Sequence, residues 1–150
     1  MNNTDLEKHE YFMRKCISLA LIAQQRGESA VGSIIVQDGK IIGEGIEGGK
    51  SHKDITFHSE IEAIRDATRQ IDAPDLSGCI LYTTHEPCIM CSYIIRHTKI
   101  SIVVTGVTTG EIGGFSSQLP LLSDTTIQRW ASPPTLITGI LEQECADLNS

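Results

Sequence analysis

The stretch that decides the fold runs from residue 79 to residue 105 and reads CILYTTHEPCIMCSYIIRHTKISIVVT. Its first part, Cys79 to Thr84, is apolar at nearly every position, which is typical of a strand covered on both faces. A helix is predicted from Cys88 to about His97, and a second buried strand from Ser101 to Thr105. A strand, a helix and a strand in succession favour two parallel strands joined by a right-handed crossover.

Regular patterns on either side of this stretch supply the other elements. Asp38-Gly39 separates two β-branched runs, and such a dipeptide is a strong signal for a hairpin. Apolar residues at helical spacing predict helices before and after that hairpin. The elements expected outside residues 79–105 are a helix from Asp5 to about Arg26, strands at 33–37 and 40–44, a helix capped by Thr56 that reaches Ile71, one or two short helices within 117–131, a strand at 135–138, and a last helix with Leu141, Cys145 and Leu148 on one face.

This order of elements predicts an α/β protein. Strands and helices alternate in the second half of the chain, which favours parallel strands, whereas the hairpin adds an antiparallel pair. We therefore expect a mixed five-stranded sheet in a three-layer α/β/α sandwich. A chain of 150 residues with no internal repeat or linker should form this sandwich as a single domain, residues 1–150.

The composition is that of a globular protein. Hydrophobic residues make up 40% of the chain and charged residues 21%, and no apolar run approaches the length that spans a bilayer. Residues 1–7 are polar and acidic, unlike a signal peptide, so we expect a cytoplasmic protein with no membrane partner. The five cysteines are an odd number, which argues for reduced thiols and metal binding rather than disulfides.

The net charge of −7 bears on the kind of partner. Phosphate contacts by lysine and arginine carry much of the affinity for nucleic acids, and no run rich in these residues is visible. A small neutral substrate therefore fits the charge more easily than a polyanion does.

Four residues in two short motifs have the chemistry of a catalytic zinc site. His58 stands two positions before Glu60, and Cys88 stands three positions before Cys91. If both motifs begin helices, the cysteines share one face and the histidine reaches the metal from the end of its helix. Three such ligands leave one tetrahedral position of a single Zn²⁺ open for water, as in catalytic zinc sites. Glu60 would then be the catalytic carboxylate that carries a proton from that water to the substrate.

Two other interpretations of these motifs stay open. A structural zinc would need a fourth protein ligand, for which Cys79 and His85 are the nearest candidates. A redox-active Cys-x-x-Cys pair is the weaker alternative, because it leaves His58 and Glu60 without a purpose.

The combined pattern, His58-Ser59-Glu60 followed by Pro87-Cys88-Ile89-Met90-Cys91, matches the general zinc-deaminase signature H-x-E…P-C-x-x-C. The chain thus resembles the cytidine-deaminase-like superfamily, whose fold is the sandwich predicted above. The resemblance is closest to bacterial tRNA adenosine deaminases and spans most of the chain, including residues 9–14, 31–36, 81–91 and 139–145. It implies a zinc-dependent hydrolase that releases ammonia from a cyclic amidine, and it implies a homodimer.

Four positions are candidates for substrate binding. Glu47 stands where the family usually has an asparagine that contacts the substrate, and bulky Phe57 replaces the usual alanine before the zinc histidine. His85 replaces an apolar residue of the family, and Phe115 lies in a glycine-rich loop that can bring it over the pocket, although packing on the core is an equally good role for it.

The substrate expected from these features is a free nucleobase or nucleoside. Glu86 before Pro87 is shared with guanine deaminases, which favours a purine such as guanine or adenine. The alternative is the tRNA-specific deaminase of adenosine-34, which the acidic net charge disfavours. The second alternative is a non-catalytic protein with a structural zinc.

Overall fold

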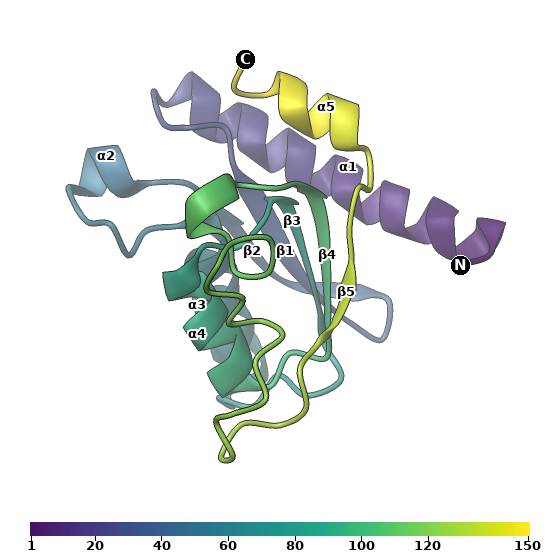
Figure 1. Cartoon of the computed structure of the whole chain (residues 1–150). Coiled ribbons are helices and arrows are strands. Elements are labelled where there is room, and N and C mark those ends of the chain that lie inside the picture. The colour runs from purple at the N-terminus through teal and green to yellow at the C-terminus, as the bar shows by residue number, and fades with distance from the viewer.

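One five-stranded sheet with helices on both faces forms the body of the computed structural model, which describes all residues from 1 to 150 (Figure 1). The elements are α1 (Asn3–Gln25), β1 (Gly32–Gln37), β2 (Lys40–Ile46), α2 (Gly49–His52), α3 (Ser59–Ile71), β3 (Ile80–His85), α4 (Ile89–Thr98), β4 (Ile102–Val107), the 3-10 turn η1 (Gly110–Ile112), β5 (Thr135–Ile137) and α5 (Glu142–Asp147).

The sheet is mixed, as the sequence predicts. Its strand order is β2-β1-β3-β4-β5. β1 pairs antiparallel with both β2 and β3, whereas β3, β4 and β5 run parallel. The hairpin between β1 and β2 turns at Asp38 and Gly39, whose φ angles of 50° and 77° are both positive. Positive φ at both central residues is what a two-residue hairpin of this kind requires.

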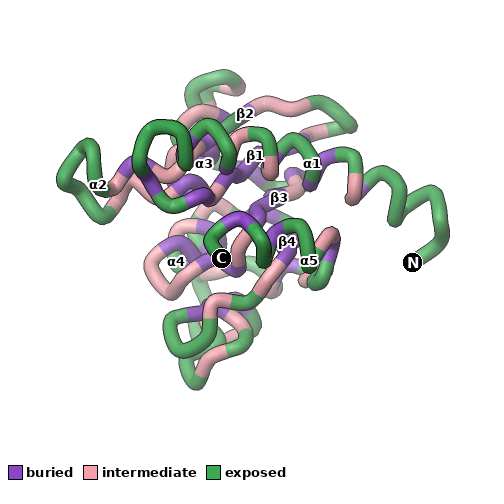
Figure 2. The backbone as a smooth tube through the Cα atoms, turned by 90° about the horizontal axis from the view of Figure 1, so that it is seen from above, coloured by how far each residue is buried: buried purple, intermediate pink, exposed green.

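Two apolar cores lie on opposite faces of the sheet, which confirms the predicted α/β/α sandwich. On one face, Ala63 and Ala67 of α3 and Ile95 of α4 pack against the sheet. On the other face, Met13 of α1 and Cys145 of α5 do so. Figure 2 shows buried stretches along β1, β3 and β4, whereas α2 is exposed. None of the helices is long and apolar enough to cross a membrane.

Glycines on β2 bring α3 unusually close to the sheet. A Cβ atom at Gly45 would collide with the backbone of Ser59, and one at Gly43 would collide with the backbone of Ala63. Glycine is the residue that permits such a close approach of two backbones. The first turn of α3, which carries Ser59 and Glu60, is therefore pressed against the strands.

The prediction of short helices within residues 117–131 is wrong, because the segment from residue 113 to residue 134 has no helix or strand. The cause is Arg96 of α4, which is buried. Its guanidinium donates to the backbone carbonyls of Leu121 and Asp124, both at 2.7 Å, and to that of Ala131 at 3.3 Å. These three carbonyls accept from a side chain, so they need no helical hydrogen-bond partner.

Candidate metal centre

The side chains of His58, Cys88 and Cys91 meet at one point. Their ligand atoms all lie within 4.8 Å of one another. His58 Nδ1 is 3.5 Å from Cys88 Sγ and 3.4 Å from Cys91 Sγ. One nitrogen and two sulfur atoms are the donor set that zinc prefers. The three residues predicted as metal ligands from the sequence are thus brought together.

Two helix starts produce this convergence. His58 is the N-cap residue of α3, with φ −75° and ψ 148°, and Cys88 is the N-cap residue of α4. Cys91 lies in the first turn of α4, and its backbone N–H donates to Cys88 Sγ at 3.5 Å. The helix of Glu60 therefore begins at Ser59, not after Thr56 as its sequence suggests. Because the positive ends of both helices face the site, they favour the thiolate form of cysteine.

Neither candidate for a fourth protein ligand belongs to this group. Cys79 is buried before the start of β3, within the apolar core on the α3 face. The ring of His85 lies 2.7 Å from the hydroxyl of Thr84 through Nδ1 and 3.2 Å from Asn149 Nδ2 through Nε2. A three-ligand site leaves a position for water, which is the catalytic arrangement of zinc.

Proton sharing among the three side chains follows from their positions. Hydrogen bonds from Cys91 and His58 lower the pKa of Cys88 to about 4, so its thiolate is the stable form. The bond to Cys88 in turn raises the pKa of His58 to about 9. The hydrogen bond with Cys88, together with burial, raises the pKa of Cys91. Metal binding must therefore displace protons from His58 and Cys91.

Glu60 lies beside these three side chains without joining them. It is the second residue of α3, and only 4% of its surface is exposed. Burial raises the pKa of Glu60 to about 7. A carboxyl group whose pKa is near neutral can both accept and release a proton at physiological pH, which is what a general acid–base group needs.

A second carboxylate, that of Glu86, anchors the loop after β4 to the cysteine motif. It is 2% exposed and accepts the backbone N–H groups of Thr109, Phe115 and Ser116 at 2.8 to 2.9 Å. The sequence places Glu86 near the motif but gives no sign of this role, because its partners are 23 to 30 positions away. The hydrogen bonds hold the loop against the motif of Cys88.

The candidate substrate residues lie in different surroundings. Glu47 and Phe57 both line a hollow of about 260 Å³, whose lining includes none of the metal-binding side chains. Phe57 stacks there on His52, with ring centroids 3.8 Å apart. Phe115 packs against the apolar core on the α3 face, which is the core-packing role considered from the sequence. His85 is bonded to Asn149, near the C-terminus. Glu47 and Phe57 are thus together, whereas Phe115 and His85 are held elsewhere.

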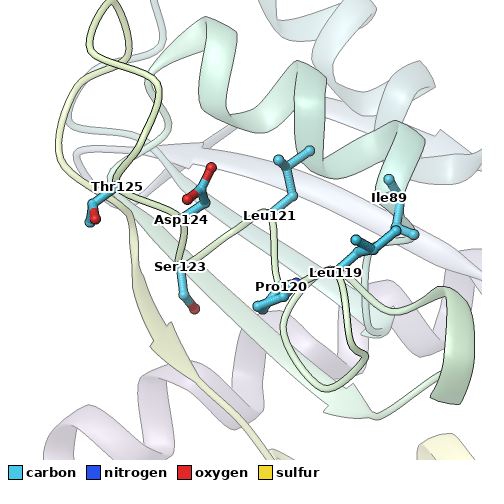
Figure 3. Close-up of a pocket in the computed structure, with 7 residues that line it drawn as sticks. All are labelled: Ile89, Leu119, Pro120, Leu121, Ser123, Asp124 and Thr125. Atoms are coloured by element: carbon cyan, nitrogen blue, oxygen red, sulfur yellow. The ribbon is translucent and has the colours of Figure 1, made fainter.

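An apolar groove of about 560 Å³ adjoins the start of α4. Figure 3 shows its lining, with Ile89 on α4 and the other residues on the loop from residue 119 to residue 125. None of the metal-binding side chains lines it. The groove is therefore a neighbouring surface and not the reaction pocket itself.

Known proteins are similar to this chain in sequence and architecture. Residues 6–107 match the family described as the cytidine and deoxycytidylate deaminase zinc-binding region. A tRNA-specific adenosine deaminase of Aquifex aeolicus is 38% identical over 118 residues, which are 79% of this chain and 78% of that protein. A structure from a study of A-to-I editing by tRNA:A34 deaminases at the wobble position of transfer RNA has a TM-score of 0.85 and 29% identity, over 92% of this chain and 98% of that one. Guanine deaminase from Bacillus subtilis has a TM-score of 0.64 and 35% identity, over 72% of this chain and 66% of that one.

Proposed function

The chain belongs to the cytidine and deoxycytidylate deaminase family of zinc-binding proteins, and we propose that it converts adenosine to inosine in tRNA. The observation that carries the proposal is the convergence of His58, Cys88 and Cys91 beside the buried carboxyl of Glu60. The substrate is proposed from the relatives, which are named tRNA-specific adenosine deaminases. The relatives thus support the RNA substrate, which was the alternative, better than the free nucleobase that charge and sequence alone suggest.

The reaction assigns a role to each of the four side chains. His58, Cys88 and Cys91 would hold zinc, which when bound activates water for attack on the ring carbon that bears the amino group. Glu60 would accept one proton from the water and pass it to the ring nitrogen, and would then take the second proton from the added hydroxyl group and give it to the departing amino group. One hydrogen of water ends on the ring and the other on ammonia, while the water oxygen becomes the carbonyl oxygen of inosine.

An RNA substrate needs positive charge near the site despite the net charge of −7. Lys50 and Lys53 are exposed on α2 and just after it, in the segment that leads into the His58 motif. Figure 1 shows α2 projecting away from the sheet. Enzymes that act on a base take it out of its stack, so phosphates on either side of the adenosine would lie outside the pocket. We propose that the two lysines bind such phosphates.

A pair of RNA hairpins tests the proposal. The zinc-loaded protein is incubated with two anticodon stem-loops that differ only in adenosine or guanosine at the wobble position, and inosine is measured after nuclease digestion. We expect inosine from the adenosine hairpin alone. No inosine from either hairpin, at low salt and with full zinc occupancy, would overturn the proposal.

A free purine base is the second candidate substrate. The acidic net charge and the carboxylate of Glu47 favour it, because a carboxylate can accept hydrogen bonds from the amino and ring N–H groups of guanine. The similarity to the guanine deaminase agrees with this reading. Ammonia release from guanine, adenine, cytosine and their nucleosides distinguishes the two candidates, since an RNA-specific enzyme should leave all of them intact.

We also propose a homodimer, on the basis of the resemblance to family members. The apolar groove beside α4 is the surface on which we expect the two chains to pack, because Leu119, which lines it, is 64% exposed. Light scattering at micromolar concentration measures the mass in solution. A mass of one chain, 16.4 kDa, would refute the dimer.

A further inference from the structure

A line of hydroxyl groups runs from Glu60 into the interior of the sheet. The hydroxyl of Ser59 donates to Glu60 Oε1 at 2.9 Å, and it lies 2.7 Å from the hydroxyl of Ser33. The hydroxyl of Ser33 donates to that of Thr83 at 2.8 Å, and Thr83 donates to the backbone carbonyl of His85 at 3.1 Å. The line therefore begins at the proposed proton carrier and ends at a fixed backbone atom.

We propose that Ser59, Ser33 and Thr83 are positioning residues that hold the carboxyl group of Glu60 in its working orientation. The inference rests on the proposed function, because it presumes that Glu60 carries protons during deamination. The inference adds Ser33 and Thr83, which lie outside the zinc-deaminase motif, and Ser59, which occupies the unspecified middle position of that motif.

Burial makes this line rigid. Ser33, Ser59 and Thr83 have no exposed surface, and Glu60 is 4% exposed. The residues come from three elements, β1, α3 and β3, which the sheet and the close packing of α3 hold together. A buried hydroxyl that loses its partner has no water to replace it. The oxygen of Glu60 that Ser59 binds is thus tied to the sheet rather than free to rotate.

Thr84 offers a matched control on the same strand. Its hydroxyl is buried like that of Thr83, but it accepts the backbone N–H of Gly32 at 3.3 Å and contacts the ring of His85, and it is not part of the line to Glu60. Successive side chains of a strand point to opposite faces. A change at Thr84 should therefore lower stability through packing by a comparable amount, without removing any hydrogen bond of the line that ends at Glu60.

The test measures kcat, KM and zinc content for Ser59→Ala, Thr83→Val, Thr83→Ser and Thr84→Val, on whichever substrate the wild-type protein deaminates. Because a misplaced general acid–base group loses part of its contribution to the rate, we expect Ser59→Ala to lower kcat by about tenfold or more with KM and zinc unchanged. Thr83→Val should lower kcat less, and Thr83→Ser, which keeps the hydroxyl, should restore it. Thr84→Val should retain the wild-type kcat.

The outcomes separate this inference from the function on which it rests. If the wild type is active, Glu60→Gln is inactive and both Ser59→Ala and Thr83→Val keep the full kcat, the inference is wrong and the proposed function stands. Equal losses of kcat in Thr83→Val, Thr83→Ser and Thr84→Val would also overturn it, since packing alone would explain them. A zinc-loaded wild type that deaminates none of the substrates would overturn the proposed function and the inference with it.

Discussion

The backbone N–H of Phe115 donates to the carboxylate of Glu86 at 2.8 Å, although the two residues lie 29 positions apart. Glu86 immediately precedes Pro87, whose carbonyl accepts the backbone N–H of Gly114 at 2.8 Å. A Cβ atom at Gly113 would collide with the Glu86 carboxylate, so any other residue there would have to displace that carboxylate. The loop after β4 and the cysteine motif therefore form one rigid unit.

Glu86→Gln should loosen this unit. The amide group keeps one acceptor oxygen and turns a donor towards backbone N–H groups, which are donors themselves. Hydrogen bonds to charged groups contribute about 1.5–3 kcal/mol each, so we expect the free energy of unfolding to fall by about 2–3 kcal/mol. Urea denaturation of the zinc-loaded protein measures the loss. Glu111→Gln, an exposed change of the same charge in the same loop, should be neutral, and an equal loss in both variants would contradict the assignment.

Acid should weaken the same anchor. Burial alone would raise the pKa of Glu86, but the hydrogen bonds from Ser116, Thr109 and Phe115 outweigh it and hold the pKa below the usual 4.5. The folded state therefore binds this proton less tightly than the unfolded state does. The stability from the carboxylate is complete above about pH 4.5 and is lost as the pH falls through the lower pKa of the folded state.

The stability difference between the wild type and Glu86→Gln should accordingly shrink below pH 4.5. Urea denaturation of both proteins without metal, at pH 7, 5, 4 and 3.5, checks this, and a chelator removes any contribution from zinc. A difference that stays constant over this range would show that the carboxylate charge is not what holds the loop.

Glu60→Gln should abolish deamination while keeping zinc and fold. The three proposed ligands remain, and only the group that accepts the proton is lost. General acid–base groups contribute about 10²–10⁴-fold to a rate, so kcat should fall by about that factor. Ammonia or inosine release measures the activity, and elemental analysis measures the zinc. Glu144→Gln, an exposed change on α5, serves as the control, and near-full turnover by Glu60→Gln would refute the mechanism.

Zinc binding should release protons. In the metal-free protein the pKa of His58 is raised to about 9 by Cys88 and the pKa of Cys91 is raised as well, so both residues are protonated at neutral pH. Zinc needs them deprotonated, so about two protons should leave per zinc, and the apparent affinity should fall about a hundredfold for each pH unit of acidification near neutral pH.

A weakly buffered titration with a pH indicator counts these protons. Cys145→Ala removes a buried thiol outside the group and should not change the count. His58→Ala and Cys88→Ala should lose zinc and stability together. Fewer than about one proton per zinc would mean that the three side chains do not share protons as their hydrogen bonds indicate.

Local patterns made most of the fold predictable from the sequence. The Asp38-Gly39 dipeptide specifies its hairpin, and the apolar runs of β3 and β4 specify buried parallel strands. Each half of the metal centre was predictable for the same reason, since the spacing of Cys88 and Cys91 is a local property of a helix start. That His58 joins them from 30 positions away was predictable only from the combined zinc-deaminase signature.

Features that depend on residues far apart in the sequence could not be predicted. The segment 117–131 lacks helices because Arg96, from another element, binds its carbonyls. The hydroxyl line joins Ser33 to Ser59 and Thr83 across 26 and 50 positions, and nothing near these serines marks them. Such hydrogen bonds exist only once the sheet has brought β1, β3 and α3 together.

The exposed lysines before the His58 motif give a prediction specific to RNA. The double change Lys50→Glu and Lys53→Glu should lower kcat/KM on the adenosine hairpin by about tenfold or more, because attraction to two phosphates becomes repulsion. The dependence of binding on salt should become shallower, by about 0.7 to 0.9 in log–log slope for each phosphate that is no longer neutralised. The control, Lys8→Glu with Lys15→Glu, makes the same change of charge on the exposed surface of α1. Equal losses of kcat/KM in both double variants would show that net charge causes the effect. No loss in either double variant would show that Lys50 and Lys53 do not contribute to RNA binding.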